Sequence, residues 1–320
     1  MVDRRQGVTR MVADVGGTNT RIALFDQGDG AFRAEHHYRN RDYGRFEDVI
    51  AAWLDALQEA APAECCLAVA APHTGDRVEM VNMDWSFSCR GIAAAFGFEG
   101  LRRINDFEAN AFALPHLGTG DAAVLHDGCG SGGKLATVGP GTGLGGATLE
   151  EMAGIHHACA CEPGHMGLSA GSGEELELFR LLLPRHGDLY AELLLSGPGL
   201  ERLYLALAEI RGERVDSLAA PAISARAVSG ADPLCAHALQ TFCALLGATC
   251  GDFLLANGAY GGLYLAGGIL PQIIPFLRES AFHQRLVAKG AMRDQLDAVP
   301  VSVITRPAPG LLGAAHAPLG

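Results

Sequence analysis

Lysine is nearly absent from this chain of 320 residues, which has only Lys134 and Lys289 among its 24 basic residues. Neither lysine stands in a G-x-x-x-x-G-K-[ST] sequence, so the P-loop route to a bound nucleotide is excluded. Clustered basic residues are missing as well, and the formal net charge is −12. Nucleic acids and anionic membrane surfaces are bound through basic faces, so we expect neither as a partner.

From the sequence we expect neither a secretory leader nor a membrane-spanning apolar run. Met1 to Arg10 is polar, and no stretch of about 18 apolar residues follows it. We therefore expect a cytoplasmic protein. Apolar residues make up 49% of the chain and charged residues 19%, which is typical of a soluble globular protein, and the length suits two domains.

The nine cysteines are odd in number, and reduced thiols are the default for a long chain without a secretory signal. His156, His157, Cys159, Cys161 and His165 could suggest a zinc site. A structural zinc site usually has a second cysteine or histidine pair at a distance, whereas this C-x-C stands alone. We favour a thiol-bearing strand that leads into a functional loop.

Glycine is abundant, with 42 residues, and it forms two loops that each lie between short apolar strands. The first loop separates the expected strands Met11–Val15 and Thr20–Asp26, and the second separates Leu135–Val138 and Ala147–Leu149. The two units are about 125 residues apart, which favours a duplicated domain over a solenoid of short repeats.

Hydrophobic periodicity predicts the remaining elements of an α/β protein with crossovers. Further strands are expected at Phe32–Tyr38, Cys65–Ala70, Leu101–Ile104, Tyr264–Leu265 and Val301–Ile304. Helices are expected at Phe46–Ala60, Gly91–Phe96, Ser196–Ile210, Pro233–Leu255 and Gly310–His316. Two more helices are expected, one that begins with a capping box at Ser172–Glu175 and one that begins at Pro271. We expect a small domain of residues 1–110 with 303–320 and a large one of residues 111–302.

The glycine loops suit the binding of phosphate groups, because backbone N–H groups can approach an anion closely where no Cβ intervenes. The candidate phosphate-binding residues are Gly16, Gly17, Thr18 and Asn19 in the first loop, Gly141, Thr142 and Gly143 in the second, and the later pair Gly267 and Gly268. Asp14, beside the first loop, is placed to hold a hydrated Mg²⁺ on those phosphates. Three such sites favour a bound nucleotide over simple tight turns.

A dinucleotide site is a competing interpretation of the second loop. Gly141 to Gly146 matches G-x-G-x-x-G, and Glu162 follows about 20 residues later. That motif should open a long helix, yet Ala147–Leu149 is short and flanked by strands. A dehydrogenase is therefore disfavoured.

Seven motifs, taken together and in this order, resemble the bacterial glucokinase family. They are DVGGTN at 14–19, INDF at 104–107, GTGLG at 141–145, EPGH at 162–165, LSGPGL at 195–200, LAGGI at 265–269 and PGLLG at 309–313. The resemblance implies the actin-like ATPase (ribonuclease H-like) fold, with two duplicated α/β domains, glucose and ATP in the cleft between them, and commonly a homodimer. It also implies the ATP-dependent phosphorylation of glucose at the 6-hydroxyl, the first step of glycolysis.

The same resemblance implies roles for individual residues. Asn105 and Asp106 would meet the 4- and 6-hydroxyls of the sugar, and Glu162, His165 and Glu192 would hold its other hydroxyls. The two glycine hairpins would hold the triphosphate of ATP, and the later glycine pair would approach its adenosine. Carboxylates, amides and imidazoles are suited to binding hydroxyl groups through directed hydrogen bonds.

Asp106 is the expected catalytic base, because an ordinary ionised aspartate can take the hydroxyl proton late in a loose phosphoryl transfer. Its alternative role is the N-terminal cap of the following helix, at which aspartate is good. Glu174, Glu175 and Glu177 fit a solvated helix face and cap rather than a site.

Two departures from the family pattern concern proline. Pro163 stands where the family more often has a glycine, and Pro140 stiffens the second loop, but neither removes a functional group. The cysteine-rich zinc-binding run of the repressor, ORF and kinase proteins is absent. A kinase of another hexose and a silent sugar-binding protein remain as alternatives, although the intact Asp14 and Asp106 argue against the second.

Overall fold

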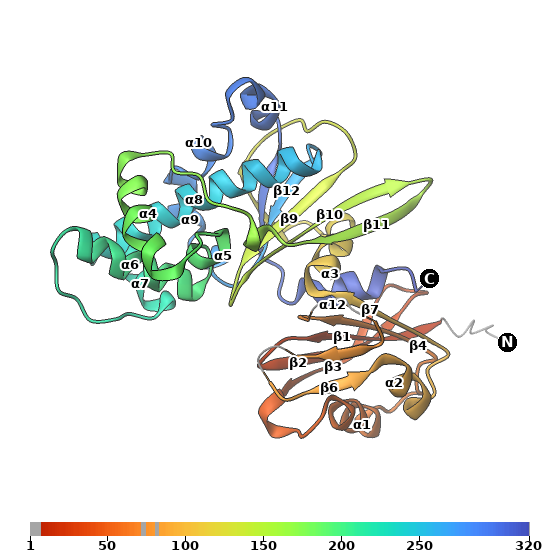
Figure 1. Cartoon of the computed structure of the whole chain (residues 1–320). Coiled ribbons are helices and arrows are strands. Elements are labelled where there is room, and N and C mark those ends of the chain that lie inside the picture. The colour runs from red at the N-terminus through yellow and green to blue at the C-terminus, as the bar shows by residue number, and fades with distance from the viewer. Residues whose placement is uncertain (1–7, 72–74, 81–82, 320) are drawn as a thin grey trace. The chain divides into compact units, whose positions relative to one another are not determined.

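The computed structural model describes residues 8–71, 75–80 and 83–319, which form two compact units (Figure 1). Unit 1 comprises Met1–His116 and Pro307–Gly320, and unit 2 comprises Leu117–Arg306. Residues 1–7 of the polar N-terminal segment lie outside the described residues. Both units are mixed α/β, as the sequence predicts.

Unit 1 is built on a five-stranded sheet with the strand order β3-β2-β1-β4-β7. Its strands are β1 (Thr9–Val15), β2 (Asn19–Asp26), β3 (Phe32–Arg39), β4 (Glu64–Val69) and β7 (Gly100–Asn105), and a small hairpin joins β5 (Arg77–Glu79) to β6 (Ser86–Ser88). Its helices are α1 (Phe46–Ala56), α2 (Cys89–Phe96), α3 (Asp106–Ala113) and α12 (Pro309–His316), with 3-10 turns at Asn40–Asp42 and Leu114–His116.

The two faces of this sheet are covered by different helices (Figure 1). Side chains alternate along β1, and Met11, Ala13 and Val15 share a core with Trp53 of α1 and Ile92 of α2. On the opposite face, α12 contacts β1 and β4, and α3 contacts β4. The sheet therefore holds the starts of α3 and α12 next to the ends of its parallel strands.

Unit 2 is built on a six-stranded sheet with the order β11-β10-β9-β12-β13-β8. Its strands are β8 (Ala122–His126), β9 (Leu135–Pro140), β10 (Leu144–Met152), β11 (Ile155–Cys161), β12 (Gly262–Leu265) and β13 (Val301–Ile304). Its helices are α4 (Gly173–His186), α5 (Ala191–Leu194), α6 (Gly197–Ile210), α7 (Ala220–Val228), α8 (Pro233–Asn257), α9 (Ile274–Glu279), α10 (Phe282–Leu286) and α11 (Arg293–Asp297), with 3-10 turns at Pro163–His165, Leu270–Gln272 and Gly290–Met292.

The two sheets share one topology. In each, two consecutive hairpins give three antiparallel strands, β1-β2-β3 and β9-β10-β11. Two later strands then extend each sheet in parallel. In unit 1, β4 pairs with β1 and β7 pairs with β4; in unit 2, β12 pairs with β9 and β13 pairs with β12. Unit 2 adds β8, which pairs antiparallel with β13. This repeated plan agrees with the duplicated α/β domain expected from the two glycine loops.

Helix α8 is long and apolar enough to cross a membrane by length and composition, with a mean hydropathy of 1.4 in its most apolar window. In the structure 83% of that window is buried inside the protein. Its side chains form much of the core of unit 2, including Phe242, Leu245 and Phe253. This burial is typical of the central helix of a globular core.

Two expected helices are wrong in extent. The helix predicted over Phe46–Ala60 ends at Ala56, because the residues beyond it are largely exposed and bury nothing that would sustain another turn. The helix expected from Pro271 is instead a 3-10 turn followed by α9, which has Pro275 in its first turn. Proline lacks the N–H that a continuous helix would need there.

Candidate active site

The first glycine loop is a tight turn between β1 and β2, closed by a 3.0 Å hydrogen bond from the Gly16 N–H to the Asn19 carbonyl. Gly17, Thr18 and Asn19 are exposed, whereas Val15 and Thr20 on either side are buried. The turn therefore presents its backbone to solvent from a rigid hairpin, as a phosphate-binding loop requires.

A buried asparagine holds this turn in place. The Asn40 side chain, only 2% exposed, donates to the Gly16 carbonyl at 2.8 Å and accepts from the Thr20 hydroxyl at 2.8 Å. Its own N–H donates to the Thr18 carbonyl at 3.0 Å. Asn40 follows the last strand of the meander, so no local pattern around the glycines indicates it.

Asp14 lies near the end of β1, in contact with the start of α12. A Cβ added to Gly310 would lie 3.1 Å from the Asp14 carboxyl carbon, so this glycine lets the helix pack against the carboxylate. Desolvation raises the pKa of Asp14, and the nearby Arg21 opposes that shift. A bound divalent cation would favour the ionised form of the Asp14 carboxyl group. Because Asp14 is half-buried beside the exposed glycine turn, its carboxylate fits Mg²⁺ ligation, either directly or through water.

Asn105 and Asp106 lie where β7 ends and α3 begins. The cap of α3 is Asn105, whose Oδ1 accepts from the N–H groups of Phe107 at 2.8 Å and Glu108 at 3.3 Å. Glu108 completes a capping box by accepting from the Asn105 N–H at 3.3 Å. The alternative role of Asp106 as the cap is therefore wrong, since Asp106 is the first helical residue.

The second glycine loop connects β9 and β10, and it is anchored by helix α6. The Gly197 N–H, at the start of α6, donates to the Gly141 carbonyl at 2.8 Å. Ser196 caps α6 by accepting from the Gly199 N–H at 3.0 Å. The LSGPGL motif therefore contains the start of α6, and the N–H of its first helical residue, Gly197, holds the second glycine loop.

Glu192 on α5 connects the second loop to the Glu162–His165 turn. Its Oε2 accepts from the Leu144 N–H at 2.9 Å, next to the loop. A Cβ on Gly143 would overlap this oxygen, and a Cβ on Gly164 would lie 3.2 Å from it. Glycines at 143 and 164 therefore allow the Glu192 carboxylate to sit between the two loops.

Glu162 directly precedes, and His165 ends, the 3-10 turn Pro163–His165, which follows the edge strand β11. Their side chains are 77% and 65% exposed, and His165 Nδ1 lies 3.8 Å from Glu162 Oε2. The His165 ring lies parallel to that of Tyr190, with centroids 5.6 Å apart. Pro163 is buried and is the first residue of the turn, a position that suits the fixed φ of proline. The strand expected to carry the thiols of Cys159 and Cys161 is confirmed as β11.

The glycine pair at 267–268 follows β12, which is the parallel neighbour of β9. Gly267 has φ +95°, and a Cβ there would overlap the Pro140 carbonyl. A Cβ on Gly139 would likewise meet the Ala266 carbonyl. Unit 2 therefore brings the second loop and this glycine pair together, although they are more than a hundred residues apart in sequence.

Comparison with known proteins gives a consistent result. The chain matches the Glucokinase family model over residues 11–319. It is 40% identical to the glucokinase of Caulobacter sp. (strain K31) over 310 residues, which cover 96% of this chain and 94% of that relative. The crystal structure of a glucokinase from an Antarctic psychrotroph is similar with a TM-score of 0.88 and 36% identity, covering 97% of this chain and 98% of that one.

The chain belongs to the glucokinase family. A more distant structure, the ROK family glucokinase of Streptomyces griseus in complex with glucose and AMPPNP, is similar with a TM-score of 0.65 at 19% identity, covering 96% of this chain and 98% of that one. At that identity the likeness concerns the fold alone. Together these neighbours confirm the actin-like ATPase fold.

One expectation about this glucokinase-family chain is wrong. Glu175 does not close a capping box and does not belong to a solvated face, since it is 5% exposed. Ser172 caps α4, but the Glu175 carboxylate accepts from Arg285 at 2.8 Å and from the Gly171 N–H at 2.6 Å. The partner Arg285 lies 110 residues away, so the sequence around Glu175 does not indicate it.

Proposed function

We propose that the protein transfers the γ-phosphoryl group of ATP to the 6-hydroxyl of glucose, giving glucose 6-phosphate and ADP. The observation that carries this proposal is membership of the glucokinase family over residues 11–319. Glucose is assigned rather than another hexose because chains that are 36–40% identical over nearly the whole length of this one are glucokinases.

Asp106 is the proposed base. Because Asn105 supplies the cap of α3, the Asp106 carboxylate is not needed for that role. The N-terminus of a helix favours the ionised form of a carboxylate, which is the form that accepts a proton. In a loose transfer the base takes the hydroxyl proton late, so positioning matters more than basicity.

The remaining sugar contacts are assigned to Asn105, Glu162, His165 and Glu192. Asn105 keeps its side-chain N–H₂ group for a hydroxyl after its Oδ1 has capped α3. Glu192 uses Oε2 for the Leu144 N–H, which leaves Oε1 as an acceptor for a sugar hydroxyl. The high exposure of Glu162 and His165 suits groups that bind a ligand from solvent.

The nucleotide is assigned to the two glycine loops and to Gly267 and Gly268. Gly268 has no atom within 4 Å of an added Cβ, so its surface is open to a ligand. Asp14 would hold Mg²⁺, which when bound to ATP neutralises charge on the phosphate oxygens. A cytoplasmic homodimer is proposed from the family resemblance.

An initial-rate assay with a panel of sugars tests the proposal. ATP, Mg²⁺ and one hexose at a time are supplied, and the release of ADP is coupled to an indicator reaction. We expect glucose to give the highest kcat/KM, with fructose much poorer. A higher kcat/KM for fructose, mannose or N-acetylmannosamine would show that the protein is another hexose kinase, and no sugar-dependent ADP release would favour a silent sugar-binding protein.

A further inference from the structure

Tyr190 lies beside the turn that carries two of the proposed sugar ligands. Its ring is parallel to the imidazole of His165, with an angle of 2° between the two planes and 5.6 Å between the centroids. This separation is within the range of favourable aromatic pairs. Tyr190 therefore stacks on a ring whose side chain is otherwise largely exposed.

The backbone at Tyr190 is joined to the same turn. Tyr190 pairs with Gly167 in an isolated antiparallel β-bridge, and the N–H of the first residue of α5 donates to the Met166 carbonyl at 2.8 Å. Met166 directly follows His165, and Glu192 comes two residues after Tyr190. The ring and the backbone of Tyr190 thus connect the His165 turn with the helix that carries Glu192.

Helix capping does not explain a tyrosine at this position. Tyr190 is the N-cap of α5, where serine, threonine, aspartate and asparagine are preferred because their side chains accept from a helix N–H. The Tyr190 side chain makes no such bond. Its ring instead packs against the core of unit 2 and against His165. A role in core packing alone would leave sugar affinity unchanged, whereas a role toward His165 would not.

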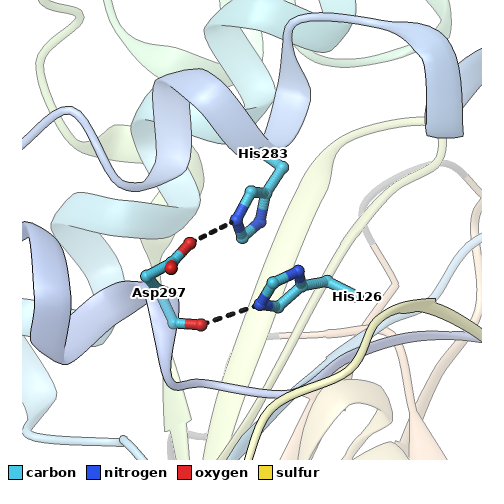
Figure 2. A group of neighbouring side chains, drawn as sticks. All are labelled: His126, His283 and Asp297. Carbon is cyan, nitrogen blue, oxygen red and sulfur yellow. Dashed lines mark hydrogen bonds and ion pairs between the residues drawn. The ribbon is translucent and has the colours of Figure 1, made fainter.

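A second stacked pair in unit 2 shows what is particular to His165. His126 and His283 stack with centroids 3.9 Å apart, and Nε2 of each ring is hydrogen-bonded to Asp297, at 2.7 Å and 2.9 Å (Figure 2). In His165, Nδ1 lies 3.8 Å from Glu162 Oε2, and no described residue bonds to Nε2. The His165 ring is therefore stacked on one face and keeps a nitrogen for a ligand hydroxyl.

We propose that Tyr190 is a positioning residue for sugar binding, which holds the His165 imidazole in the orientation that receives a sugar hydroxyl. The inference rests on the proposed function, in which His165 binds a hydroxyl away from the reacting oxygen. A free side chain loses rotational freedom when it binds a ligand, and that loss weakens affinity. Stacking restricts the ring before the sugar arrives, so removal of the Tyr190 ring should weaken sugar binding and leave the transfer step unaffected.

Steady-state kinetics of Tyr190 variants test this role. Tyr190→Ala should raise the KM for glucose about fivefold, with kcat and the KM for ATP changed by less than about twofold. Tyr190→Phe keeps the ring and should restore the KM of the wild type. Tyr260→Ala is the matched control, because Tyr260 also packs partly against the core of unit 2 but precedes β12, at the end of that strand opposite Gly267. It should leave the KM for glucose unchanged.

A double-mutant cycle separates the contact with His165 from packing. In a His165→Ala background, Tyr190→Ala should change the KM for glucose by less than about twofold, since the group that it orients is gone. An effect that persists at full size in this background would assign Tyr190 to packing and overturn the proposal. A Tyr190→Ala variant with the KM of the wild type would also overturn it, as would a Tyr190→Phe variant as impaired as the alanine variant.

Proton NMR of the imidazoles gives a readout that does not depend on catalysis. The His165 signals, assigned by their absence in His165→Ala, should shift in Tyr190→Ala and not in Tyr190→Phe, because the two aromatic rings produce similar ring currents. The signals of His126 and His283 serve as the internal reference. A wild type that phosphorylates no sugar would contradict the proposed function and the role of Tyr190 together, whereas an active wild type with unshifted His165 signals in Tyr190→Ala would overturn this inference alone.

Discussion

The two glycine hairpins have the same pattern in sequence but are held in different ways. The first is clamped by the neutral side chain of Asn40, which bonds to Gly16 and Thr20 of the hairpin and also donates weakly to the Met83 sulfur at 3.6 Å. The second is held by the carboxylate of Glu192, which also lies against the Glu162–His165 turn. The first anchor therefore contacts no proposed sugar-binding residue, whereas the second connects a proposed nucleotide loop with proposed sugar-binding residues.

The largest expected effect comes from a residue that anchors neither hairpin. Asp106→Asn should lower kcat by at least about 100-fold, while the Kd for glucose changes by less than about tenfold. Asparagine keeps the shape and one acceptor but cannot take a proton. Steady-state kinetics and calorimetry measure the two quantities, and a variant with most of its kcat would reassign Asp106 to binding.

The next largest effect is expected on protein stability, from a substitution at the glycine that packs against the second hairpin. Gly267→Ala should lower the free energy of unfolding by more than about 1 kcal/mol, because φ is +95° and the Pro140 carbonyl occupies the space of a Cβ. Gly268→Ala is the matched control and should leave stability unchanged, because its Cβ would meet no atom within 4 Å. Urea unfolding followed by circular dichroism compares the two, and equal stabilities would contradict this packing.

Substitutions of the two anchoring residues, Asn40 and Glu192, should change the KM for ATP and the KM for glucose differently. Asn40→Ala should raise the KM for ATP and leave the KM for glucose nearly unchanged. Glu192→Ala should raise both, because it removes the acceptor of the Leu144 N–H and a sugar ligand together. Glu192→Gln keeps a carbonyl acceptor and should raise mainly the KM for glucose. If both alanine variants raise the same single constant, the two anchors are equivalent.

The smallest expected effect is a pH dependence of unit 1. His316, at the end of α12, stacks on His116 with ring centroids 3.5 Å apart. Desolvation first, and then His116 and Arg10, lower the pKa of His316 from 6.5 to about 4. Between these values the unfolded chain binds more protons, so stability should fall as pH drops through this window. His316→Gln should flatten that slope in thermal unfolding, and an unchanged slope would assign the proton uptake elsewhere.

The sequence predicts the parts of this molecule that depend on local chemistry. Glycine turns between apolar strands, the helix with a serine cap at Ser196 and the strand carrying Cys159 follow from short patterns and are confirmed. The roles assigned to Asp106 and to the sugar-binding residues rest on family resemblance and remain predictions.

Long-range partners could not be predicted from such patterns. Asn40, Gly310 and the Glu175–Arg285 pair contact residues that are 20 to 296 positions away in the sequence, and only the fold creates these contacts. Short or irregular elements were also missed, among them β8 and α11, since a few residues carry too little periodicity. These missed elements are the ones that bring His126 and Asp297 together.

Analysis of the product by ³¹P NMR tests the central claim most directly. The wild-type protein, with ATP, Mg²⁺ and glucose, should give glucose 6-phosphate and ADP in equal amounts, and Asp106→Asn should give almost none in the same time. ADP without any sugar phosphate, or phosphate on a different hydroxyl of glucose, would contradict the account.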